Sequence, residues 1–161
     1  MSRKTGKDRV FSRRLSEVRP FEFNQTVANV FDDMISRSVP GYSLLLRMIG
    51  LYASLFVQPD SRVYDLGCSL GEASLVIAAQ SEAGNCQIIA VDNSAAMIAK
   101  CRQQQPPPRN IEWRCEDIRQ TGIANASLVV LNLTLQFLPP EERFELLQRI
   151  FEGLNSGGAL V

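Results

Sequence analysis

From Ser61 onward, short apolar runs alternate with segments of helical composition. The runs are RVYDL at 62–66, CQIIAVD at 86–92, IEWRC at 111–115 and SLVVLNL at 127–133. Each is about as long as a buried strand and is rich in β-branched or apolar residues. Segments 71–82 and 94–104 between them favour helices, the second closed by three prolines. Strands that alternate with helices predict an α/β fold, a parallel sheet with helices on both faces.

Two helices are expected before the first strand. Apolar residues recur at helical spacing from Val27 to Ile35, with Asn24 or Thr26 as the cap, and this helix should end before Pro40. The second should run through LLLRMIGLYASLFV with Ser43 as its cap. That run is short for a membrane span and contains an arginine, which predicts a buried helix instead.

A last helix is expected after the fourth strand. It should open at PPEE, residues 139–142, and end at NSGG, residues 155–158. A fifth strand would only begin at residues 158–161.

The first twenty residues hold seven Lys or Arg against Asp8 and Glu17, with no sustained apolar period. They predict a basic flexible arm over 1–22, either a solubilising tail or an arm that touches RNA or another acidic surface. Over the whole chain Lys+Arg and Asp+Glu number 17 each, so the overall charge predicts neither a nucleic-acid nor a membrane partner. No apolar stretch follows the basic residues, so no signal peptide is expected.

The chain has no histidine, and its four cysteines form no C-x-x-C pair. This composition excludes the usual zinc spacings and every Ser-His or Cys-His catalytic arrangement, so no metal is expected. Separated cysteines with mostly apolar neighbours predict a reducing, cytoplasmic location.

The first predicted strand ends in the loop DLGCSLG. In an open α/β sheet, ligands lie beyond the carboxyl ends of the strands. Gly67 lets backbone approach a ligand closely, and Gly71 lets the next helix begin close to the sheet. The dinucleotide pattern G-x-G-x-x-G is broken by Ser69 and Glu72, which disfavours a pyrophosphate. Asp65 would repel phosphate but could attract an ammonium group or order the loop.

Two further acidic residues follow predicted strands. Asp92 ends the second strand, where a carboxylate can accept hydrogen bonds from both hydroxyls of a ribose; alternatively it caps the next helix. Asp117 follows the third strand, where it could meet an adenine edge or simply form a turn.

These residues carry a resemblance. DLGCSLG, VDNS, CEDI, LNLTLQFL and LNSGGALV resemble successive motifs of the S-adenosylmethionine-dependent methyltransferase fold. More narrowly, SRSVPGYS, YDLGCSLG with its serine, VDNS and NLTLQFL resemble the carboxy-S-adenosyl-L-methionine synthase family, from about Phe23 to Val161. The resemblance implies a helical extension at 23–58 and a Rossmann-like S-adenosylmethionine-binding domain at 59–161.

The resemblance also implies an activity. Members of that family convert S-adenosylmethionine and prephenate to carboxy-S-adenosylmethionine and phenylpyruvate, by way of a sulfonium ylide that captures carbon dioxide. They are homodimers, and a partner enzyme transfers the carboxymethyl group to the wobble uridine of tRNA, so no direct tRNA contact is required. On this view the protein mainly positions reactants and excludes water, and no residue is singled out as catalytic.

Binding residues are implied position by position. They are Gly67, Cys68 and Ser69 in the ligand loop, Asp92 and Asn93 at the ribose, Asp117 and Ile118 at the adenine, Asn132 after strand four, and Tyr42 near the reacting end. Plainer alternatives stay open for three of them. Tyr42 could pack in the turn between two helices, Asn132 could satisfy backbone groups, and Cys68 could contribute only backbone and fit.

Members of that family continue past GGALV with further strands, helices and an arginine that holds the added carboxylate. The resemblance therefore predicts a C-terminally truncated chain whose outer strands are missing. Such a sheet should expose an apolar edge, which predicts poor solubility or association. An ordinary S-adenosylmethionine-dependent methyltransferase and a non-catalytic S-adenosylmethionine-binding fragment remain as alternative functions.

Overall fold

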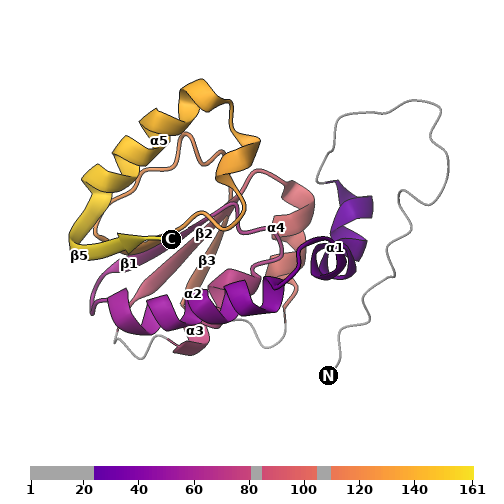
Figure 1. Cartoon of the computed structure of the whole chain (residues 1–161), viewed down its shortest axis with the longest axis horizontal. Coiled ribbons are helices and arrows are strands. Elements are labelled where there is room, and N and C mark those ends of the chain that lie inside the picture. The colour runs from indigo at the N-terminus through magenta and orange to yellow at the C-terminus, as the bar shows by residue number, and fades with distance from the viewer. Residues whose placement is uncertain (1–23, 81–84, 105–109) are drawn as a thin grey trace.

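The computed structural model describes residues 24–80, 85–104 and 110–161, so the predicted basic arm lies outside the described residues (Figure 1). The elements are α1 (Gln25–Ser38), α2 (Tyr42–Phe56), β1 (Arg62–Leu66), α3 (Glu72–Gln80), β2 (Gln87–Asp92), α4 (Ala95–Arg102), β3 (Ile111–Cys115), β4 (Ala126–Val130), the 3-10 turn η1 (Leu135–Phe137), α5 (Pro140–Gly153) and β5 (Leu154–Leu160). The expected alternation of strands and helices is confirmed.

The strands form one parallel sheet in the order β3-β2-β1-β4-β5. The chain first builds outward from β1 to β3 and then returns to place β4 on the other side of β1. Tyr64 of β1 lies opposite Ile89 of β2 and Val129 of β4. This reversal of strand order leaves a crevice beyond the carboxyl ends of β1 and β4, where ligands bind in such sheets.

Helices cover both faces of the sheet, as predicted (Figure 1). Tyr64 and Leu66 pack on one face with Leu146 of α5, whereas Val63 packs on the other with Ile49 of α2. Because both faces are buried, the central strands are apolar at nearly every position.

The N-terminal helices differ from each other in how they begin. Asn24 caps α1, and its Oδ1 accepts hydrogen bonds from the amides of Thr26 (3.0 Å) and Val27 (3.2 Å). Of the two predicted caps, Asn24 is thus confirmed. The prediction of Ser43 as the cap of α2 is wrong, because Gly41 takes that place with a φ of 79°. Glycine adopts this left-handed conformation without the steric cost of a side chain.

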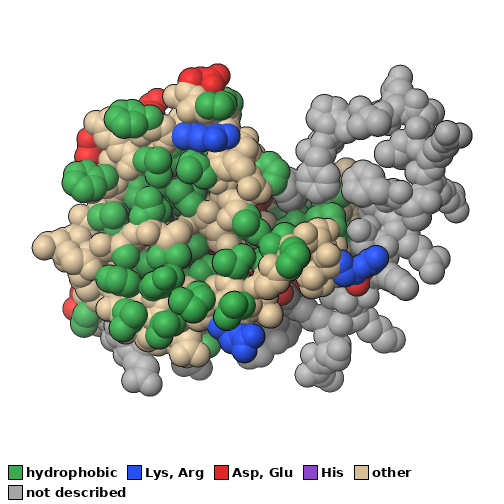
Figure 2. All heavy atoms as spheres, in the orientation of Figure 1, with side chains coloured by type: hydrophobic (Ala, Val, Ile, Leu, Met, Phe, Trp, Pro, Cys, Tyr) green, Lys and Arg blue, Asp and Glu red, His purple; other side chains and the backbone are tan. Residues whose placement is uncertain are grey.

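The prediction that the second helix is buried holds for one side only. Gly50 lets α2 approach α3 so closely that an added Cβ would lie 2.8 Å from Val76. Another side exposes Leu44, Leu51 and Leu55. Figure 2 shows hydrophobic side chains gathered over the region of this helix. Within the described ranges no single helix is long and apolar enough to cross a membrane; α1 and α2 pass that test only as a pair bent by 96°.

The C-terminal boundaries also differ from the prediction. β4 ends at Val130, three residues before the apolar run does, and the chain then turns, with a φ of 56° at Leu133. The expected turn at residues 155–158 lies inside β5, which already pairs with β4 at Leu154. The register shifts within β5, and Gly157 with a φ of 77° accommodates the irregular segment.

Candidate functional site

A cavity of about 710 Å³ lies at the carboxyl ends of the strands. Its walls come from α1, the start of α2 and the loops after β1, β2, β3 and β4. All the binding residues that the resemblance implies line it: Tyr42, Gly67, Cys68, Ser69, Asp92, Asn93, Asp117, Ile118 and Asn132. The fold thus brings residues up to ninety positions apart into one site.

The conformation and close contacts of the loop after β1 account for its glycines. Gly67 has a φ of 84°, and a side chain there would overlap Thr134 on the opposite wall. At Gly71 a side chain would overlap the ring of Trp113, so this glycine serves close packing against β3. Ser69 also has a positive φ, of 49°, which is uncommon for a residue with a side chain. Its amide donates to Asp92, which holds the loop in this conformation.

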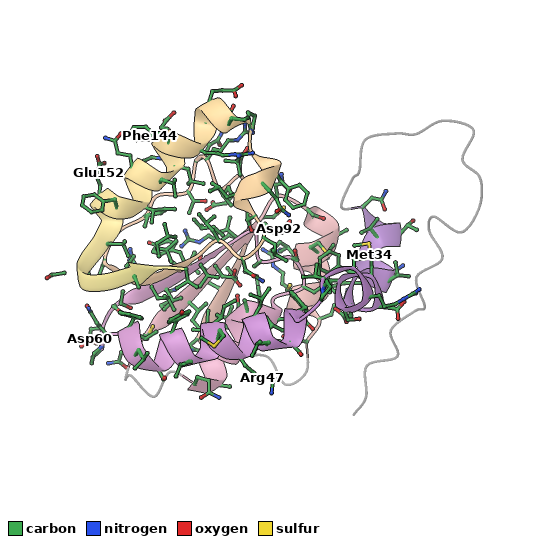
Figure 3. All side chains as sticks on the ribbon, viewed as in Figure 1. Met34, Arg47, Asp60, Asp92, Phe144 and Glu152 are labelled. Atoms are coloured by element: carbon green, nitrogen blue, oxygen red, sulfur yellow. The ribbon has the colours of Figure 1, made fainter. Side chains whose placement is uncertain are left out.

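Asp92 connects two loops from the centre of the site (Figure 3). It is only 9% exposed, and burial raises its pKa. Its Oδ2 accepts from the amide of Ser69 (2.9 Å) and its Oδ1 from that of Ser94 (2.8 Å). Capping of α4 falls to Ser94, whose Oγ accepts from the amide of Met97. A carboxylate has about four lone-pair sites, so Asp92 retains acceptor capacity for a ligand.

Asp65 lies behind the same loop and is 1% exposed. Ser74 of α3 donates its hydroxyl to Asp65 Oδ2 at 2.5 Å. Burial raises the pKa of Asp65 to about 6, and the nearby Asp92 adds to the increase. This bond joins β1 to α3, the two elements that flank the loop, and both predicted roles of Asp65 stay predictions.

Asp117 is held by a neighbour that the sequence reasoning missed. The Nε of Arg119 donates to both carboxylate oxygens of Asp117, at 3.0 and 2.9 Å, and its amide donates to Oδ1. This pairing lowers the pKa of Asp117. Asp117 therefore forms a turn, as the plainer alternative predicted, while it also lines the cavity. The D-x-R spacing was a possible signal, although it does not show that the two side chains meet.

Tyr42 and Asn132 line the cavity from different elements. Tyr42 is the first residue of α2; burial, then the charge of Glu72 and a hydrogen bond with it, raise the pKa of the Tyr42 phenol, so it stays protonated. The carbonyl of Asn132 accepts from Thr134 Oγ1 at 3.1 Å, in the loop that follows β4.

Sequence reasoning also missed an apolar wall. Phe31, Met34 and Ile35 of α1 line the cavity, and Phe137 and Leu138 line it beyond β4. Figure 3 labels Met34 on α1 and Asp92 at the end of β2, which both line the cavity. The helical spacing of the α1 residues was visible in the sequence, but core and cavity residues share that spacing.

The site carries an excess of negative charge. Asp65, Asp92 and Asp117 line it, whereas Arg119 is the sole cation among the lining residues that the structure describes, and it is paired with Asp117 and Glu142. Cys68 is buried and its pKa is raised by a hydrogen bond with Cys101 and by burial, so it is a thiol and not a reactive thiolate. Within the described ranges, no group of three or more His, Cys, Asp or Glu is placed to hold a metal.

A parallel sheet with this strand order, and a cavity rich in carboxylates at its switch point, define an α/β protein of the S-adenosylmethionine-dependent methyltransferase fold. The chain belongs to the methyltransferase domain family, whose sequence model matches residues 63–158.

Relatives and a solved structure agree with that assignment. The chain is 48% identical to the carboxy-S-adenosyl-L-methionine synthase of Shewanella sp. (strain W3-18-1) over 98% of its length, and 52% identical to that of Citrobacter koseri over 96%. It spans 66% and 64% of the length of these proteins. The fold resembles the N-methyltransferase NodS from Bradyrhizobium japonicum in complex with S-adenosyl-L-homocysteine, with a TM-score of 0.62, 21% identity, and coverage of 79% of this chain and 63% of NodS. The resemblance stated from the motifs is confirmed.

Proposed function

We propose that the chain binds S-adenosylmethionine and acts as a carboxy-S-adenosyl-L-methionine synthase. In the proposed reaction, prephenate loses its ring carboxyl group as carbon dioxide and its hydroxyl group, and becomes phenylpyruvate. The carbon dioxide forms a bond to the sulfonium methyl carbon, and the proton displaced from that carbon leaves with the hydroxyl group as water. The product would serve the 5-oxyacetyluridine modification of tRNA wobble positions.

The observation that carries this proposal is the convergence of nine separately marked residues on one cavity. Sequence identity of about half to named synthases supports the particular activity. The charge of the site supports the ligand, because carboxylates attract the sulfonium and ammonium groups of S-adenosylmethionine. Tyr42, kept protonated, offers a neutral polar group at the proposed reacting end.

Each wall has a proposed contact with the ligand. Asp92 would accept from the ribose hydroxyls, Asp117 and Ile118 would meet the adenine, and the 67–69 loop would hold the methionine portion. The described lining residues offer a dianion such as prephenate no unpaired positive charge. We therefore expect the chain to bind S-adenosylmethionine without prephenate, and prephenate alone far more weakly.

The proposal extends to partners and location. A homodimer would hand carboxy-S-adenosylmethionine to a tRNA carboxymethyltransferase, with no membrane or direct tRNA contact of its own. Cys68, Cys86, Cys101 and Cys115 are all free, which supports a cytoplasmic location.

Mass spectrometry of the small molecules that copurify with the chain tests the proposal first. Carboxy-S-adenosylmethionine is the expected species, and incubation with S-adenosylmethionine and prephenate should release phenylpyruvate. Bound S-adenosylmethionine without phenylpyruvate would instead indicate a binding fragment. Transfer of a labelled methyl group to tRNA would indicate an ordinary methyltransferase. No binding of either compound by folded protein would overturn the proposal.

A further inference from the structure

Arg119 joins two walls of the cavity that come from distant parts of the chain. Its Nε and Nη2 donate to the carboxylate of Asp117, after β3, and its Nη1 donates to Glu142 Oε2 at 2.8 Å. Glu142 lies in the first turn of α5, directly after the segment 136–139 that lines the cavity. One side chain thus fixes the β3 wall relative to the β4 wall.

Two arginines of α5 also donate hydrogen bonds to these walls, but to backbone carbonyl groups. Arg143 Nε donates to the carbonyl of Leu138 (3.0 Å), and Arg149 Nη2 to that of Ile118 (3.5 Å). Leu138 and Ile118 line the cavity, but these bonds reach only their backbone carbonyls and leave their side chains unbonded. Arg119 differs because it holds the carboxylate of Asp117, a group that a ligand can reach.

The charge and the orientation of Asp117 determine what it can recognise. An ionised carboxylate, the form of an aspartate at neutral pH, only accepts hydrogen bonds, whereas a protonated one also donates. Arg119 holds the plane of the two carboxylate oxygens through its hydrogen bonds to both of them. A ligand atom beside Asp117 must therefore be a donor, such as an exocyclic amino group, and a carbonyl oxygen there would be repelled.

We propose that Arg119 is a positioning residue that orients Asp117, so that the cavity selects a 6-aminopurine over a 6-oxopurine. This inference rests on the proposed function for the placement of the adenosyl group beside Asp117. A site built to accept a hydrogen bond rejects analogues that lack the donor, because its polar group is then left unpaired.

The experiment compares S-adenosylhomocysteine with S-inosylhomocysteine, which carries a carbonyl in place of the amino group. Dissociation constants for both would be measured by calorimetry with the full chain and with Arg119→Gln. The full chain should prefer the adenosyl compound by roughly 30-fold, the effect of one hydrogen bond to a charged acceptor. In Arg119→Gln the preference should fall to about threefold or less.

A matched control is available on β3, the strand that precedes Asp117. Arg114 pairs with Glu112 at the same two-residue spacing, with Nε to Oε1 at 2.7 Å, but neither residue lines the cavity. Arg114→Gln should therefore leave the preference unchanged. Glu142→Gln, which releases only the link to α5, should weaken both compounds alike and preserve the preference.

A conservative variant separates orientation from simple loss of structure. Arg119→Lys keeps the positive charge but lacks the planar guanidinium group, and it should give an intermediate preference for the adenosyl compound. If Arg119→Gln does not melt cooperatively and so is not folded, the preference of Arg119→Lys tests the inference in its place. Retention of the full preference in Arg119→Gln would overturn the inference alone, whereas failure of the full chain to bind either compound would overturn the proposed function with it.

Discussion

Asp92 and Asp117 follow neighbouring parallel strands and line the same cavity, yet the protein holds them in opposite ways. Asp92 is 9% exposed and is bound by backbone amides, whereas the side chain of Asp117 is 26% exposed and is bound by a guanidinium. Burial raises the pKa of the first, and the hydrogen bond with Arg119 lowers the pKa of the second.

The difference teaches what each end of the cavity depends on. The Asp92 end is fixed by the backbone of two loops, so its geometry is inseparable from the fold. The Asp117 end is fixed by charges near the surface, whose interaction is screened by salt and contributes little to stability. Variants at the two ends should therefore differ in how much stability they lose and in whether that loss depends on salt.

Asp92→Ala should produce the largest effect. It leaves the amides of Ser69 and Ser94 without their acceptor and removes the proposed ribose contacts. We expect the free energy of unfolding to fall by about 3 kcal/mol, and S-adenosylmethionine to bind at least about 30-fold more weakly. Urea titration and calorimetry measure the two losses. Asp92→Asn keeps one acceptor oxygen, and its losses of stability and affinity should lie between those of Asp92→Ala and zero. Unchanged affinity in Asp92→Ala would show that the ribose lies elsewhere.

A pH titration of stability should show the next largest effect. The folded-state pKa of Asp65, about 6, exceeds its unfolded value, so the folded protein binds the extra proton between these values and stability decreases as the pH rises through them. From pH 4.5 to 7 this loss should be about 2 kcal/mol in ligand-free protein. Asp92, with its pKa also raised, acts in the same direction. Asp65→Asn should flatten the dependence, and an equally steep curve in that variant would assign it to other groups.

The same contrast separates what could be predicted from sequence. β1 and β3 match their predicted apolar runs to the residue, because loop-forming residues bound them on both sides. β5 does not, because NSGG is typical of a turn and only pairing with β4 makes it extended. Intrinsic preferences at this edge yield to tertiary contacts.

In the site, residues at strand ends were predictable and their partners were not. Parallel strands bring their carboxyl ends to one edge, and both Asp92 and Asp117 were predicted to follow strands there and to contact one ligand. Nothing in the sequence distinguishes Met34, which lines the cavity, from Val27, which packs in the core, since both fit one helical period. Whether Arg119 meets Asp117 likewise depends on the path of the turn, which emerges only in the folded chain.

Asp117→Asn should have the smallest effect on stability and the clearest dependence on salt. It removes one charge of the Asp117–Arg119–Glu142 network, whose side chains are all more than a quarter exposed. The melting temperature should fall by about 2 °C or less at low salt, and the difference from the unaltered chain should vanish near 1 M salt, where charges are screened within about 3 Å. The loss in Asp92→Ala should persist at 1 M salt, because amides buried in the fold gain no acceptor from added ions. Equal salt dependence in the two variants, measured by thermal melts, would show that both ends of the cavity are held by the same forces.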